Sequence, residues 1–148
     1  MITIVVNDQD VQATLSKLLA ATADLTPAFQ SIGERLVYTT KQRFADGEDP
    51  DGNAWAENSV LTLSRKKGDA PLIGESKALS SGIYYDAASD ALQIGSAQEY
   101  AAVQQFGAKQ HAFGKSPWGD IPARPFIGLS ADDVDAIALL VRDHLLGA

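Results

Sequence analysis

The amino-acid sequence predicts an α+β fold, in which N-terminal helices and a C-terminal helix pack on a mainly antiparallel β-sheet. Three observations support this prediction. Apolar residues recur at helical spacing over residues 27–44, two β-branched or aromatic runs at residues 83–85 and 92–94 flank a short connection, and a capped amphipathic segment begins at Ser130. Helices at both ends of the chain with strands between them favour α+β over an alternating α/β arrangement.

The first third of the chain is expected to hold one strand and two helices. Residues 2–6 form a β-branched run that predicts a strand, and residues 11–22 carry apolar side chains on one helical face. Thr26 as the N-cap and Pro27 as the first helical residue predict a second helix that ends near Gly47. Its buried stripe should comprise Phe29, Ile32, Gly33, Leu36, Val37, Thr40 and Phe44.

The middle of the chain alternates loops with short elements. Residues 47–52 (GEDPDG) have the composition of a loop, and residues 60–67 predict a short helix. The two runs over residues 83–94 predict a β-hairpin with a connection of four or five residues. Residues 99–106 predict another short helix, which Gly107 closes.

The last part of the chain is expected to contain a loop, a strand and a helix. Residues 108–121 should form an exposed, mobile loop, and residues 121–127 should be extended because each proline disfavours helix in the residue before it. Ser130 and Asp133 occupy the positions of a capping box for the last helix. The buried stripe of that helix should comprise Val134, Ile137, Ala138, Val141 and Leu145.

The composition limits which classes of protein this chain can belong to. The 148 residues suit a single domain, and the absence of cysteine excludes disulfides, thiolate metal sites and thiol nucleophiles. A formal charge of −7 disfavours a nucleic-acid-binding module, which usually carries a basic excess. The chain shows no signal-peptide pattern and no apolar run near the roughly 20 residues that cross a bilayer, so we expect no membrane partner.

The sequence contains no convincing catalytic or metal-binding pattern. A calcium loop over residues 47–58 would place Gly47 and Asn58 where carboxylate ligands are required. The two histidines, His111 and His144, lack the further ligands that zinc needs. Neither a nucleophile elbow nor a phosphate-binding loop is present. We therefore expect no catalytic residue, no metal and no cofactor, with a small hydrolase or nuclease as a remote alternative.

Four segments in order carry a family resemblance. Arg43-Phe44 precedes DPDG at residues 49–52 and Trp55, and residues 72–79 follow as the second segment. The third segment is YAAVQQFG at residues 100–107, and the fourth is IPARPFIGLS at residues 121–130. Over about residues 1–146, the chain resembles the phage virion morphogenesis family, which includes the tail-completion proteins of Mu-like phages. It departs from the family at position 104, where glutamine stands in place of a frequent histidine.

The resemblance implies a structural role in tail completion and head–tail joining, without catalysis. Family members are expected to assemble as homo-oligomeric rings that contact tail-tube or neck proteins and let DNA pass without specific binding. The corresponding location is the tail or neck of the virion, and the host cytoplasm during assembly. A tail terminator and a minor head or neck protein are the alternatives.

The residues expected to matter are those of the motifs and the loop aromatics. Phe113 and Trp118 lie in a predicted loop, where exposed aromatic side chains tend to mark interfaces. Arg124 should pair with a carboxylate of the same or a neighbouring subunit. The assembly interface or motif framework should therefore comprise Trp55, Tyr100, Gln105, Phe106, Phe113, Trp118, Arg124, Pro125 and Phe126.

Overall fold

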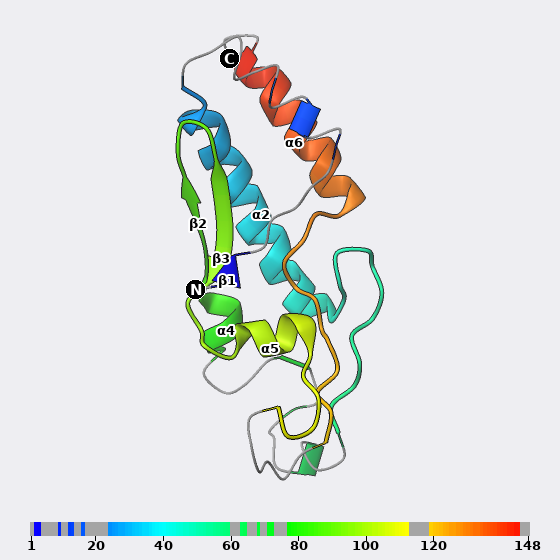
Figure 1. The fold of residues 1–148 in the computed structure, drawn as a ribbon. Helices are drawn as coiled ribbons and strands as arrows, with labels where there is room; N and C mark the ends of the chain where they lie inside the picture. The colour runs from blue at the N-terminus through cyan, green and yellow to red at the C-terminus, as the bar shows by residue number, and fades with distance from the viewer. Residues whose placement is uncertain are drawn as a thin grey trace.

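Two long helices and a small antiparallel sheet dominate the computed structural model of the chain (Figure 1). The structure describes residues 2–3, 9, 12–13, 16, 24–59, 63–64, 68, 71–72, 77–112 and 119–145. Most of the helix predicted at residues 11–22 lies outside the described residues, as do Phe113 and Trp118. Of the helix predicted at residues 60–67, only Leu63 and Ser64 are described, and both are helical.

Helix α2 (Thr26–Asp46) confirms the predicted second helix. It ends as expected, because Gly47 adopts a left-handed conformation (φ 71°) and donates its N–H to Arg43 O at 2.7 Å. The predicted N-cap was wrong. Thr26 is the first helical residue, and the Asp24 carboxylate accepts hydrogen bonds from the Thr26 N–H (2.9 Å) and hydroxyl (2.6 Å). The N-cap position is Leu25, and no side chain forms a cap hydrogen bond there.

Among the described residues, the sheet consists of three antiparallel strands in the order β1-β3-β2. Strands β2 (Ile83–Ala87) and β3 (Leu92–Ser96) form the predicted hairpin, closed by a hydrogen bond from Ala88 N to Ala91 O at 2.8 Å. The short strand β1 (Ile2–Thr3) pairs with the other side of β3. It covers two of the five residues predicted for the first strand, and residues 4–6 lie outside the described part of the chain.

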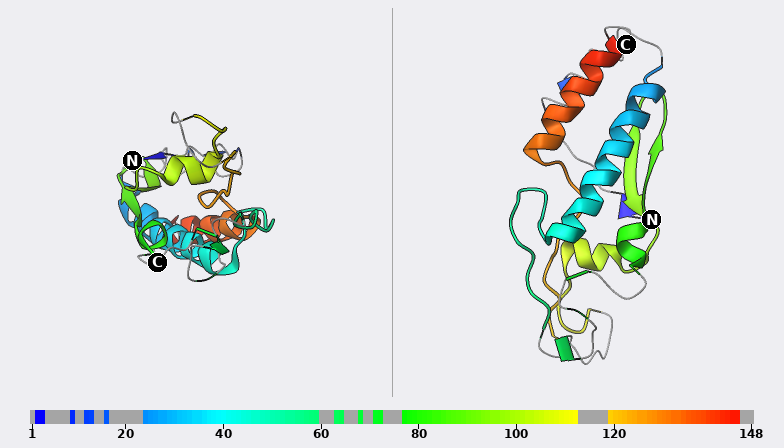
Figure 2. Two further views of the ribbon diagram at one scale, coloured as in Figure 1. Left: turned by 90° about the horizontal axis from the view of Figure 1, so that it is seen from below. Right: turned by 180° about the vertical axis from the view of Figure 1, so that it is seen from behind.

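Helix α2 lies between the hairpin and helix α6 (Ala131–Leu145), as both views of the ribbon show (Figures 1 and 2). The hairpin approaches α2 closely at Gly33, where an added Cβ would lie 2.4 Å from Cδ2 of Tyr85. Glycine is therefore required at this position by the packing of the tyrosine ring. The predicted stripe of α2 is buried except for Val37, which is half-buried.

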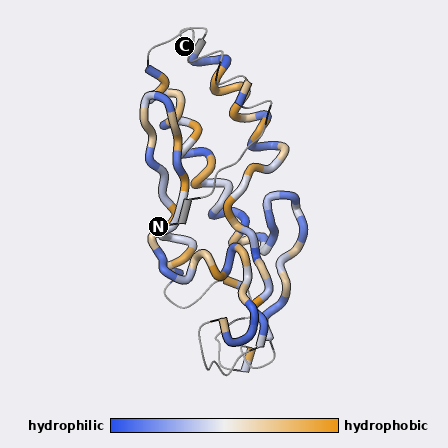
Figure 3. The backbone as a smooth tube through the Cα atoms, viewed as in Figure 1, coloured by the Kyte–Doolittle hydropathy of each residue, from blue (hydrophilic) through white to orange (hydrophobic). Residues whose placement is uncertain are grey.

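Two clusters of buried side chains form the core, and hydrophobic residues alternate with hydrophilic ones along α2 and α6 (Figure 3). The first cluster joins α2 to α6. The second lies at the other end of α2 and surrounds Phe126, which has no exposed surface. The members of the first are Leu25, Phe29, Ile32, Leu36, Ile137 and Val141, and those of the second are Phe44, Trp55, Leu79, Ile83, Ala101, Phe126 and Ile127.

Helix α6 is rotated relative to its predicted orientation. Ile137 and Val141 are buried as expected, but Ala138 is exposed and the charged Asp133 is fully buried. The pattern of apolar residues missed this rotation because the position of Asp133 is set by an ion pair with α2. The Leu145 side chain lies outside the described part of the structure.

Two short helices flank the hairpin in the sequence. Helix α4 (Ala78–Ser81) precedes β2, and α5 (Ala101–Phe106) begins two residues later than predicted. Gly107 ends α5 with φ 73°, and a Cβ there would lie 2.6 Å from Ile121 O. A β-branched or bulky residue would therefore be excluded at this turn by both backbone strain and contact.

Residues 121–127 are extended, but the predicted strand was wrong. In the described structure this segment joins the sheet at no point, and its one strand-like contact is the isolated bridge between Ala108 and Ile121. Pro122 and Pro125 lack the N–H groups that a strand donates to its neighbour. The bridge fastens the two ends of the loop over residues 108–121. No helix among the described residues is long and apolar enough to cross a membrane.

Candidate functional site

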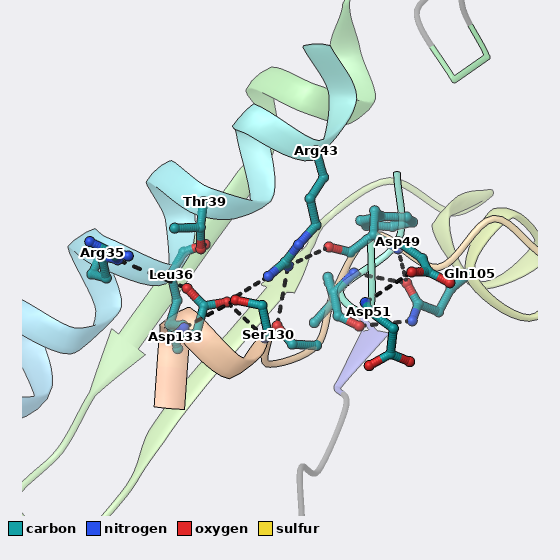
Figure 4. A network of polar contacts seen from close by, with 12 residues as sticks. Arg35, Leu36, Thr39, Arg43, Asp49, Asp51, Gln105, Ser130 and Asp133 are labelled. Carbon is teal, nitrogen blue, oxygen red and sulfur yellow. Dashed lines mark hydrogen bonds and ion pairs between the residues drawn. The ribbon is translucent and has the colours of Figure 1, made fainter. Parts of the chain in front are cut away.

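The extended segment at residues 124–128 is the structural centre of the motifs singled out in the sequence. Side chains from α2, α5 and the loop after α2, rather than a neighbouring strand, satisfy its backbone polar groups (Figure 4). Buried backbone groups must find partners, and their loss is costly. The segment is therefore fixed by a small number of specific side chains.

Arg43 connects α2 to this segment and to α6. Its Nη1 donates to Phe126 O (3.0 Å) and Gly128 O (3.1 Å), and its Nη2 donates to Asp133 Oδ2 at 2.6 Å. The arginine is 7% exposed and the aspartate has no exposed surface. A buried charge is tolerated when it is both paired and hydrogen-bonded, and the planar guanidinium provides several donors at once. The Arg43 side chain thus connects α2, the extended segment and α6.

Asp133 has two roles. It forms the predicted capping box, because its Oδ2 accepts from Ser130 N (3.1 Å) and its own N–H donates to Ser130 Oγ (3.0 Å). Its Oδ1 is buried without a hydrogen bond and lies 3.9 Å from Nε of Arg35, a distance that allows attraction between charges but is too long for a hydrogen bond. Asp133 therefore caps the start of α6 and neutralises the buried Arg43.

The side-chain amide of Gln105 forms hydrogen bonds with the extended segment of the kind that the backbone of a neighbouring strand would form. Its Oε1 accepts from the N–H groups of Phe126 (2.9 Å) and Ile127 (3.1 Å), and its Nε2 donates to Ile127 O at 3.0 Å. The backbone adds a bond from Arg124 N to Gln104 O at 2.7 Å. These contacts hold α5 against the extended segment and place Gln105 among the buried residues around it.

Trp55 and Arg124 fasten the loop after α2 to the same segment. The indole N–H of Trp55 donates to Pro125 O at 2.7 Å, and Arg124 donates to Ala56 O (2.7 Å) and Glu57 O (2.8 Å). Burial lowers the pKa of the Arg124 guanidinium. Among the described residues, backbone carbonyls accept from its Nε and Nη2, and the carboxylate partner expected in this or a neighbouring subunit stays a prediction.

Aromatic packing completes the framework. The ring of Phe44 lies 5.5 Å from that of Trp55, nearly edge-on, and 5.3 Å from that of Phe126. Such pairs contribute about 0.5–1.5 kcal/mol beyond the burial of their surface. The predicted residues Trp55, Gln105, Arg124 and Phe126 thus come together in one buried cluster, with the half-buried Pro125 between them.

Two predicted residues point outward from this cluster. Tyr100 is 45% exposed and Phe106 is 66% exposed, whereas Ala101 and Gln105 of the same short helix are buried. The contacts of Gln105 fix which face of α5 is presented. Large exposed aromatic side chains on a fixed element are suited to burial against another protein.

A second surface was missed by reasoning from the sequence. Residues of α2 and β2 line an open groove of about 480 Å³, which includes the 61% exposed Tyr38. The only signal in the sequence was a tyrosine on the polar side of α2. The groove is lined by Glu34, Val37, Tyr38, Lys41, Ile83, Tyr84 and Tyr85.

The sequence analysis also missed Arg43 and Asp133 as a pair, although an arginine within a buried helical stripe indicates a buried partner.

The acidic loop at residues 47–52 is stabilised by its own contacts. Asp49 Oδ1 accepts from Asn53 N and from Asp51 N, each at 2.9 Å, and the hydrogen bond from the Asn53 backbone is the main cause of the lowered pKa of Asp49. In the described part of the chain, no group of three or more His, Asp or Glu residues is arranged to hold a metal ion. The geometry of the loop is that of a turn.

The comparisons with known proteins agree with the motifs. Residues 6–146 match the phage virion morphogenesis family. The chain is 30% identical over 138 residues to the Mu-like prophage FluMu G protein 2 of Haemophilus influenzae, an alignment that covers 93% of this chain and 91% of the relative. No solved structure matches the chain.

Proposed function

Because the chain belongs to the phage virion morphogenesis family, we propose that it is a structural protein of tail completion and head–tail joining, without catalytic activity. The observation that carries this proposal is the match to the family over residues 6–146, almost the whole length of the chain. The motif residues support a structural role because they bond to backbone groups and to one another rather than facing a cavity.

Assembly into a homo-oligomeric ring is the second part of the proposal. Tyr100, just before α5, and Phe106, at its end, are exposed, and Gln105 fixes the helix against the buried framework. We assign these aromatic residues to the contact with neighbouring subunits or with tail-tube and neck proteins. A heterologous contact that closes by rotation produces a ring. The net charge of −7 would let such a ring pass DNA without binding it.

The test is electron microscopy of lysates from the parent phage or prophage after deletion of this gene. DNA-filled heads beside unattached tails are the expected result, and restoration by the wild-type gene is the control. Complementation with Phe106→Ser should fail, although the purified variant remains folded because the side chain is exposed. Complementation with Glu99→Gln, an exposed polar change in the turn before α5, should succeed.

Other phenotypes would redirect the assignment. Tails of irregular length would favour a tail terminator, and empty heads would favour a minor head or neck protein. Intact and infectious virions would exclude a required structural role. In that case assays for hydrolase or nuclease activity would follow, since family membership alone does not exclude catalysis.

A further inference from the structure

The groove between α2 and β2 has a pattern of charge that is complementary to itself. Glu34 and Lys41 lie at its two ends on one face of α2, and Val37 and Tyr38 lie between them. Seven residues of helix separate the two charges, which is about 10.5 Å along the axis and too far for them to pair within one chain. Within the described residues, neither side chain forms an ion pair.

We propose that this groove is the contact between two copies of the chain, which pair through antiparallel α2 helices about a two-fold axis. An axis that passes between Val37 and Tyr38 brings Glu34 of each copy opposite Lys41 of the other. Two equivalent charge pairs then form at once, as an isologous contact requires. A parallel arrangement in register would instead place like charges together, which is unfavourable.

The apolar content of the groove supports this occupant. Ile83 is buried and Tyr85 is half-buried at the floor, while Tyr38 projects from the rim and is 61% exposed. In the antiparallel arrangement, Tyr38 of one copy lies over Val37 and the floor of the other. Tyrosine is enriched at protein interfaces because it buries a large apolar surface while its hydroxyl keeps a polar partner.

The described helices and strands leave the groove accessible. Helix α6 packs on α2 from the side opposite the hairpin, so it does not cover the groove (Figures 1 and 2). Strand β2 is the edge strand of the described sheet, because it pairs with β3 alone. An edge strand of this kind is commonly protected by a covering element, and a second copy would supply one.

The decisive experiment uses charge reversal and mixing in the full chain. Sedimentation velocity should show the wild-type protein in a concentration-dependent equilibrium between monomer and dimer. Glu34→Lys alone and Lys41→Glu alone should each weaken dimerisation by at least about tenfold, because each creates two like-charge pairs. An equimolar mixture of the two variants should dimerise again, since every pair across that mixed interface is attractive.

Matched variants separate this contact from general charge effects. Asp135→Lys makes the same change of net charge as Glu34→Lys on an exposed position of α6, and it should leave dimerisation unchanged. Tyr38→Ser should weaken it without changing any charge. Circular dichroism checks that each variant is folded.

Three results would overturn the proposal: a wild-type protein that is monomeric throughout, single reversals that leave association unchanged, or a mixture that fails to recover it. A wild-type monomer would leave this groove to a different partner protein. The ring proposed above uses Tyr100 and Phe106 instead, so either idea can fail without the other.

Discussion

Replacement of Arg43 by methionine should be among the most destabilising single changes in this protein. The substitution keeps most of the length of the side chain but removes the guanidinium, which donates to Phe126 O, to Gly128 O and to Asp133 Oδ2. Asp133 has no exposed surface, so its carboxylate would be left buried without its closest counter-charge. Removal of one partner from a buried ion pair costs about 3–5 kcal/mol.

The assay is equilibrium unfolding in urea followed by circular dichroism. For a domain of this size, a loss of about 3–5 kcal/mol corresponds to a fall in melting temperature of roughly 6–20 °C. Arg35→Met is the matched control, because Arg35 approaches the other oxygen of the same carboxylate at 3.9 Å and its side chain is 41% exposed. Exposed pairs contribute about 0–1 kcal/mol, so the control should change stability little.

A double variant tests the cause of the loss. Arg43→Met combined with Asp133→Asn removes both charges, and it should be less destabilised than the sum of the two single variants because no buried charge remains unpaired. The reasoning is refuted if Arg43→Met costs less than about 1 kcal/mol, the upper end of what an exposed pair contributes. It is also refuted if Arg35→Met costs as much as Arg43→Met.

Three further outcomes follow from local geometry. Gly33→Ala should destabilise the protein by about 1–3 kcal/mol in thermal unfolding, because the new Cβ meets the Tyr85 ring at 2.4 Å, and Tyr85→Ala in the same chain should remove most of that penalty. Gln105→Leu should cost about 1–3 kcal/mol in urea unfolding, because backbone groups of Phe126 and Ile127 lose their partners, and an unchanged midpoint would contradict the strand-like role of the amide. The lowered pKa of Asp49 means that its hydrogen bonds stabilise the fold above the ordinary value of 3.8, and this contribution disappears as the pH falls through the lowered native pKa. Asp49→Ala should therefore reduce the difference in stability between pH 7 and acid pH, and an identical pH profile would exclude this contribution.

Much of the fold followed from local sequence. The hairpin at residues 83–96, the end of α2 at Gly47 and the capping box of Ser130 with Asp133 were all predictable, because each depends on residues within a few positions of one another. The motifs also selected Trp55 and Gln105 as framework residues, which the structure places in one buried cluster. Local chemistry was sufficient at these three places, whereas at the start of α2 it selected Thr26 although Asp24, two residues before it, is the acceptor.

The tertiary structure decided the interactions between distant residues. Arg43 and Asp133 are separated by 90 positions, and their pairing rotates α6 so that an aspartate is buried and Ala138 is exposed. Residues 121–127 were predicted to be an extended strand, yet side chains of Arg43, Trp55 and Gln105 take the place of a neighbouring strand. No periodic pattern encodes such contacts. Hydrophobic spacing indicates which face of a helix or strand is buried, but not which polar group of a distant element that face will contact. The sequence by itself therefore indicated most of the described helices and strands and the family, and only the packing of α2 between the hairpin and α6 determined how the motif residues act together.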